Sequence, residues 1–343
     1  MNDVTKPTEV KPEVKAVVPT TSLAKPLPVG NKPATAVAKP ASAVAGRAVQ
    51  PGVVIKPTAA PAFKIKSKED REAARYVKVL VYADFGIGKT YFAGTAANVP
   101  QMNDVLAIAA ESGDLTWDTD DSGQNNFENI DSVQVYDYKT VVKVFDFLKL
   151  HCLYRDDPSP EAVAKLIDLQ SKFTGVPVEE IKEPKRYRTC IIDSLTEVET
   201  YCMMQLLNIT DKTSLSDESQ TAEWAEYKKQ HTMVQRLVRA YRDLPMHVIF
   251  VCSRTYVQDE TKRFLYSPAM TGKLSSQIQG FMDIVGYLIT VPAEDGKSLT
   301  RRLMVQPTGK FAAKCRLSNF RKPYWDNPSM AGILKDVGML KTK

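Results

Sequence analysis

The feature of the sequence that most limits the fold is a short glycine-containing loop between a strand and a helix. The apolar run Tyr76–Tyr82 predicts a buried strand, the segment Ala83-Asp-Phe-Gly-Ile-Gly-Lys-Thr90 follows it, and a helix is expected from about Lys89. Gly86 and Gly88 permit backbone angles that turn successive N–H groups toward one point. A strand that enters such a loop and a helix that leaves it are typical of a phosphate-binding loop in an α/β protein.

The residue types in this loop fit the binding of a nucleoside triphosphate. The amino end of the helix adds partial positive charge, Lys89 can reach the β- and γ-phosphates, and the Thr90 hydroxyl can ligate Mg²⁺. The first position of the pattern is normally glycine but is Ala83 here, so the same turn is made with a β-carbon present. We expect ATP and Mg²⁺ to bind here, with contacts from Ala83, Asp84, Phe85, Gly86, Ile87, Gly88, Lys89, Thr90 and Tyr91.

Two acidic residues end other predicted strands. Asp193 ends the strand Arg188–Asp193 and is the expected partner of Thr90 in holding Mg²⁺; the alternative is that it caps the helix that follows. Glu111 ends the strand Asp104–Ala110, where a carboxylate can polarise a water that attacks the γ-phosphate. The alternative for Glu111 is a solvated side chain or a turn cap.

Three further residues are candidates for contacts with the γ-phosphate. Ser253 follows the strand Met246–Cys252, and in a parallel sheet the carboxyl ends of the strands border the ligand. Lys314 and Arg316 lie two apart on an expected strand and so share one face, which suits the γ-phosphate of a neighbouring subunit. A solvated basic strand edge is the alternative for this pair.

The rest of the chain alternates between helical and strand patterns. A proline at the first helical position, Ser159-Pro160-Glu161, opens one helix, and hairpins are expected at 255–265 and 283–314, with turns at Asp259-Glu260 and Glu294-Asp-Gly296. A parallel sheet with an antiparallel extension follows from this order. In the helix at 221–244, a stripe of residues at helical spacing predicts core packing: Trp224, Tyr227, Val234, Leu237, Val238 and Tyr241.

The first 66 residues differ in composition from the remainder. They hold ten of the 21 prolines and carry a net charge of +7, so the other 277 residues carry −1 of the chain's +6. Such a segment buries too little apolar area to fold, which predicts a disordered tail that is either a plain linker or a basic tether for a recombination or replication partner. The five cysteines form no CxxC pair, and neither a signal peptide nor a membrane span is visible, so we expect a cytoplasmic protein that binds no membrane.

The order of these motifs resembles the RecA-like ATPase core. Three segments resemble more closely the bacteriophage nucleotide-binding proteins of the Sak single-strand-annealing type. They are Ile192-Asp-Ser-Leu-Thr-Glu197, Pro268-Ala-Met-Thr-Gly-Lys-Leu274 and Ala313-Lys-Cys-Arg316. The resemblance covers roughly residues 76–320, although Ala83 and the long section 112–187 depart from the pattern. It implies a RecA-like, mostly parallel sheet with flanking helices and C-terminal antiparallel hairpins.

The same resemblance implies an activity and an assembly. Glu111 would activate water, Lys314 and Arg316 would act in trans within a homo-oligomer, and single-stranded DNA would be the substrate, in the host cytoplasm if the protein is phage-encoded. We expect a tail at 1–66, an ATPase domain at 67–320 and a C-terminal extension at 321–343. The alternatives are an AAA-type or helicase-loader-like motor acting on proteins, a nucleotide-binding scaffold that does not hydrolyse ATP and, least favoured, a small-molecule kinase.

Overall fold

The computed structural model describes residues 76–340, except for 112, 118–126, 218–220, 259–261, 294–295 and 318–319. All described residues belong to the second of two units into which the chain divides, Lys64–Lys343. The predicted tail 1–66 and the expected turn residues Asp259, Glu260, Glu294 and Asp295 lie outside the described residues.

One mixed sheet organises the described part of the chain, and its spatial order is β10-β8-β7-β1-β5-β4-β2-β3. The six strands from β7 to β3 in this order are parallel, while β6, β8, β9 and β10 pair antiparallel with their neighbours. The strands are β1 (Lys78–Ala83), β2 (Val105–Ala109), β3 (Ile130–Gln134), β4 (Thr189–Asp193), β5 (His247–Gln258), β6 (Phe264–Pro268), β7 (Ile284–Pro292), β8 (Leu299–Met304), β9 (Lys314–Cys315) and β10 (Tyr324–Asp326).

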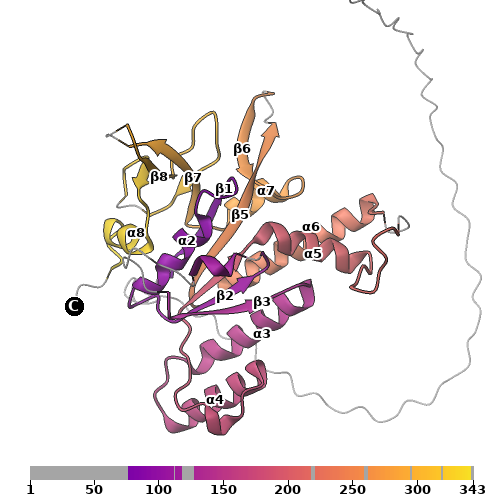
Figure 1. The fold of residues 1–343 in the computed structure, drawn as a ribbon, viewed down its shortest axis with the longest axis vertical. Helices are drawn as coiled ribbons and strands as arrows, with labels where there is room; N and C mark the ends of the chain where they lie inside the picture. The colour runs from indigo at the N-terminus through magenta and orange to yellow at the C-terminus, as the bar shows by residue number, and fades with distance from the viewer. Residues whose placement is uncertain are drawn as a thin grey trace, which may run out of the picture. The chain divides into compact units, whose positions relative to one another are not determined.

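Helices cover both faces of the parallel strands (Figure 1). Side chains alternate along each strand, so Leu80 and Tyr82 face one core while Val79 and Val81 face the other. The first core is shared with α3, α5 and α6, and the second with α2 and α8. The helices are α2 (Lys89–Gly94), α3 (Tyr138–Tyr154), α4 (Pro160–Thr174), α5 (Leu195–Leu206), α6 (Trp224–Asp243), α7 (Leu274–Gln279) and α8 (Met330–Asp336), with 3₁₀ turns η1 (Thr95–Asn98), η2 (Asp114–Trp117) and η3 (Val178–Glu180).

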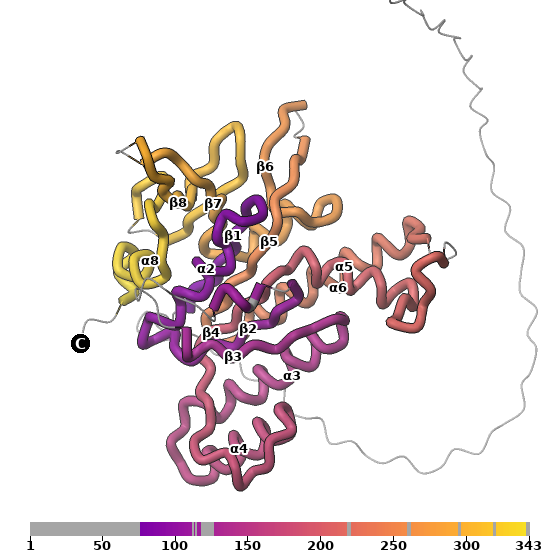
Figure 2. The backbone as a smooth tube through the Cα atoms, in the orientation of Figure 1, coloured from indigo at the N-terminus to yellow at the C-terminus, as the bar shows by residue number. Residues whose placement is uncertain are grey.

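Local sequence signals locate several of these boundaries. The Ser159 side chain accepts a hydrogen bond from the Ala162 N–H, Pro160 is the first residue of α4, and Gly175 ends the helix with φ 77°. The expected hairpins form as β5–β6 and β7–β8, and Figure 2 traces β5 out of the sheet and back as β6. The α/β architecture with a parallel sheet and C-terminal antiparallel strands is therefore confirmed.

The prediction of core packing along α6 is wrong at its first turns. Val234, Leu237, Val238 and Tyr241 are buried as expected, but Trp224 is 84% exposed and Tyr227 is 42% exposed. The amino end of α6 extends away from the sheet alongside α5 (Figure 1), so no sheet surface is available to cover these two rings. Within the described residues, no helix combines the length and apolar character needed to cross a membrane.

Candidate functional site

The glycine loop lies between β1 and α2, as its sequence context requires. Gly86 has φ 73° and Gly88, the residue before α2, has φ 98°, both in the region that residues other than glycine rarely adopt. Lys89 is buried, and its Nζ donates to the carbonyl oxygens of Asp84 at 2.9 Å and Ala83 at 3.4 Å. Burial lowers the pKa of Lys89, although nearby acids, Glu111 first, oppose this. The loop thus turns a desolvated cation toward its own interior.

Thr90 and Asp193 meet directly in the structure, although they lie 103 positions apart. The Thr90 Oγ1 donates to the Asp193 Oδ2 at 2.6 Å. Burial raises the pKa of Asp193 to about 6, with a further increase from Glu111 and an opposing effect of the Thr90 hydrogen bond. The helix-capping alternative for Asp193 does not hold, because the N-cap of α5 is Ser194, whose side chain accepts from the Glu197 N–H.

Glu111 lies beside this pair because β2 and β4 are neighbours. Ala109 is aligned with Asp193, and the Glu111 N–H donates to the Asp193 carbonyl oxygen at 3.2 Å. The Ser194 hydroxyl donates to the Glu111 Oε1, so the half-buried glutamate side chain is held at the carboxyl end of β4. Three side chains predicted from separate motifs, Thr90, Asp193 and Glu111, therefore lie at one edge of the sheet.

Ser253 also lies at this edge, since β5 separates β1 from β4. It is aligned with Ala83, and its N–H donates to the Thr196 Oγ1 at 3.1 Å. Arg254, the next residue, forms an ion pair with Asp84 of the glycine loop. This ion pair is the largest cause of the raised pKa of Arg254. The strand β5 is thus linked to the loop by its pairing with β1 and by the Arg254–Asp84 ion pair.

Two aromatic rings lie near the glycine loop, Phe85 within it and Tyr91 in the first turn of α2. Phe85 is exposed, and the Lys89 Nζ lies 5.6 Å from its ring centroid. Tyr91 packs edge-on against Phe127 with a centroid distance of 5.7 Å.

Lys314 and Arg316 are not brought to the glycine loop of their own chain. Lys314 is aligned with Val285 of β7, which in turn is aligned with Leu80, three residues before the loop begins. The Lys314 Nζ and an Arg316 Nη donate to the carbonyl oxygens of Gln279 and Gly280 at the end of α7, at 2.5 and 2.6 Å. Burial and the neighbouring Arg316 lower the pKa of Lys314 to about 8. Both cations therefore contact the same end of α7, as expected for side chains on one face of a strand. Their action in trans stays a prediction.

Besides Ser194, Arg301 and Gly113 are site residues that were not predicted from sequence. Arg301 of β8 donates through Nε to the Ile87 carbonyl oxygen at 3.1 Å, 214 positions away. Gly113 lies beside the Thr90–Asp193 pair, because a Cβ at this position would be 3.5 Å from the Thr90 Oγ1. No local pattern indicates either contact; only the pairing of β7 with β8 brings Arg301 near the loop.

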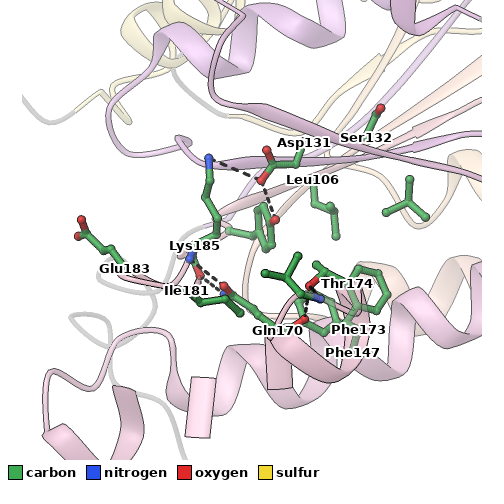
Figure 3. Close-up of a pocket in the computed structure, with 13 residues that line it drawn as sticks. Leu106, Asp131, Ser132, Phe147, Gln170, Phe173, Thr174, Ile181, Glu183 and Lys185 are labelled. Atoms are coloured by element: carbon green, nitrogen blue, oxygen red, sulfur yellow. Dashed lines mark hydrogen bonds and ion pairs between the residues drawn. The ribbon is translucent and has the colours of Figure 1, made fainter. Parts of the chain in front are cut away.

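A cavity of about 320 Å³ lies elsewhere, between the edge strand β3, α3, α4 and the segment that leads to β4. Figure 3 shows Phe147 and Phe173 along one wall, with Asp131 and Lys185 as polar groups. The Lys185 Nζ pairs with Asp131 at 3.6 Å, and Gln170 exchanges hydrogen bonds with the Lys185 backbone. These polar groups satisfy one another, and none of the predicted site residues lines the cavity.

Comparisons with known proteins place the chain in a family. No curated protein matches the sequence significantly. Similar solved structures include the flagellar accessory protein FlaH from Methanocaldococcus jannaschii, with 8% identity, TM-score 0.36 and coverage of 73% of this chain and 84% of that one. Another is the RadB recombinase, with 12% identity, TM-score 0.33 and coverage of 66% and 79%. The family described as "AAA domain" matches residues 75–317, and the chain belongs to this family of ATPase-type domains.

Proposed function

We propose that this protein binds ATP with Mg²⁺ at the loop Ala83–Thr90 and hydrolyses it. The observation that carries the proposal is the 2.6 Å contact between the Thr90 hydroxyl and the Asp193 carboxylate, with Glu111 held next to it by Ser194. A hydroxyl and a carboxylate at the end of a buried strand are the oxygen donors that Mg²⁺ takes in nucleotide sites. These residues therefore fit the metal.

Each residue of the site has a role in this proposal. Lys89 releases the loop carbonyl oxygens and binds the β- and γ-phosphates, while Thr90 and Asp193 hold Mg²⁺. The bound ion supplies charge neutralisation at the phosphates. Glu111 accepts a proton from the attacking water, and the Ser194 hydrogen bond fixes the direction of its carboxylate. Ser253, aligned with Ala83 at the same edge of the sheet, would contact the γ-phosphate.

We propose single-stranded DNA as the substrate on which this ATPase acts. The β5–β6 hairpin supports this idea, because its register places Arg254, Tyr256, Phe264 and Tyr266 on one face. Tyr256 is 57% exposed and Phe264 is 66% exposed, and the Arg254 Cζ lies 4.4 Å from the Tyr266 ring centroid. Aromatic rings alternating with a cation suit the stacking of unpaired bases. The same face begins at the ion pair with Asp84 of the glycine loop.

The assembly and the setting belong to the same proposal. Lys314 and Arg316 would reach the nucleotide of a neighbouring subunit, so the active form would be a homo-oligomer of the phage Sak recombination type. The segment 1–66 would recruit a recombination or replication protein. The five cysteines, none of them in a disulfide, fit the reducing cytoplasm of a cell or of a phage host.

The test is ATP hydrolysis by the full chain with and without single-stranded DNA, at low and moderate salt. The expected result is turnover that DNA stimulates, that fades as salt increases and that is absent in Lys89→Ala. Turnover that ignores DNA would favour the motor that acts on proteins. ATP binding without turnover, unchanged in Glu111→Gln, would favour the nucleotide-gated scaffold.

A further inference from the structure

Arg301 is the one residue of the β7–β8 hairpin that the described contacts place against the glycine loop. Its Nε donates to the Ile87 carbonyl oxygen at 3.1 Å. A Cβ added to Gly88 would lie 2.7 Å from this Nε and 3.0 Å from the Cζ, so the guanidinium rests directly on the glycine. The Cζ also lies 5.1 Å from the Tyr91 ring centroid. The cation therefore spans three residues of the predicted phosphate site.

The charge of Arg301 is not neutralised by any carboxylate among the residues that the structure describes. The adjacent Arg302 points to the other face of β8, as the period of two requires, and pairs with Asp326 at 2.6 Å. Arg302 also stacks on Tyr324, with its Cζ 3.8 Å from the ring centroid. Arg302 thus forms an ion pair, whereas Arg301 lies against the glycine loop without a carboxylate partner among the described residues.

The position of the guanidinium indicates which phosphates it can reach. The backbone on the amino side of α2 faces the α- and β-phosphates, whereas the γ-phosphate belongs near the Thr90–Asp193 pair and Glu111. The contacts found for Arg301 among the described residues are with Ile87, Gly88 and Tyr91, and not with that pair or with Glu111. Arginine presents several donors in a planar fork that matches phosphate oxygens.

We propose that Arg301 is a nucleotide-binding residue, supplied in cis by the β7–β8 hairpin, that engages the α- and β-phosphates. This inference rests on the proposed function, since it needs a nucleotide in the loop. On binding, the guanidinium exchanges the Ile87 carbonyl oxygen for phosphate oxygens and draws β8 onto the nucleotide. Because ADP and ATP share these two phosphates, Arg301 contributes equally to the affinity for both and leaves the chemical step unchanged.

An arginine that only stabilises the conformation of the loop would make the same contact with Ile87. Substitutions separate this structural role from nucleotide binding. Arg301→Gln keeps a side-chain N–H for the Ile87 carbonyl oxygen but removes the charge. Arg301→Lys keeps the charge but loses the planar fork. Arg302→Gln is the matched control, since it removes a charge from the same strand on the opposite face. The backbone pairing of Arg301 with Thr290 does not depend on its side chain.

The experiment measures the dissociation constants of ATP and ADP for the full chain by calorimetry, with thermal melting as a check on folding. Arg301→Gln should weaken both nucleotides about tenfold or more, as expected for lost charge-assisted hydrogen bonds. The affinities of Arg301→Lys should fall between those of this variant and the wild type, while the dissociation constants of ATP and ADP for Arg302→Gln should match those of the wild type.

Several results would overturn the inference. If Arg301→Gln binds both nucleotides with wild-type affinity, Arg301 has only a structural role or none. A loss of kcat alone would show a role at the γ-phosphate. If Lys89→Ala abolishes binding while Arg301→Gln does not, only this inference fails. If the wild-type chain binds neither nucleotide, the proposed function fails together with it.

Discussion

Asp193→Asn should make the nucleotide-free protein more stable at neutral pH. The same substitution should abolish Mg²⁺-dependent binding of ATP. Burial and the nearby Glu111 raise the pKa of Asp193 from its ordinary value of 3.8 to about 6. The folded state therefore holds a proton that the unfolded state releases, so ionisation of Asp193 costs stability. This cost is absent below pH 3.8, grows as pH rises and is complete above pH 6. The pKa difference corresponds to a cost on the order of 3 kcal/mol, which is an upper bound because Asn must replace the bond to Thr90.

The assay is urea or thermal unfolding of both proteins in EDTA at several pH values from 4 to 8. At pH 7.5 the Asn variant should be more stable by about 1–3 kcal/mol, and each kcal/mol raises the Tm of a domain of this size by about 2–4 °C. The difference should shrink toward pH 4. A difference that does not vary with pH, or a variant less stable than the wild type at pH 7.5, would refute the reasoning. Loss of Mg-dependent ATP binding in the same variant would complete the result.

Three further substitutions test other parts of the structure. Glu111→Gln should lower ATP turnover by about a hundredfold or more in steady-state assays while the Kd of ATP stays unchanged, because only the proton acceptor is lost. Phe250→Ala, in the buried first half of β5, should lower the free energy of unfolding by about 3–5 kcal/mol in urea titrations. Trp224→Ser should change it by less than about 0.5 kcal/mol, since the ring is exposed; a larger loss would contradict the position found for α6.

Features with local causes could be predicted from the sequence. The strand before the glycine loop, the helix after it and the opening of α4 at Ser159-Pro160 depend on residues within a few positions of one another. The parallel order followed from the alternation of strands and helices. The edge shared by Asp193 and Glu111 also follows from this order, because carboxyl ends of parallel strands meet on one side.

Features that depend on distant packing could not be predicted in this way. The helical stripe on α6 correctly identified its buried half, but nothing in the sequence shows that the sheet ends before Trp224 is reached. The spacing of Lys314 and Arg316 predicted a shared face but not that α7 would supply their acceptors. The contact of Arg301 with Ile87 needs the pairing of two strands and the position of a loop far away in the chain.

The unbroken course of β5 has a mechanical consequence. Its twelve residues contain neither glycine nor proline, and they run from the buried centre of the sheet, past Ser253, into the hairpin with β6. At about 3.3 Å per residue the strand is about 40 Å long, and it is buried in its first half and partly exposed toward the hairpin. Its pairing with β1 and the Arg254–Asp84 ion pair join the middle of the strand to the glycine loop. A displacement of the glycine loop would therefore be carried along one continuous strand to the β5–β6 hairpin.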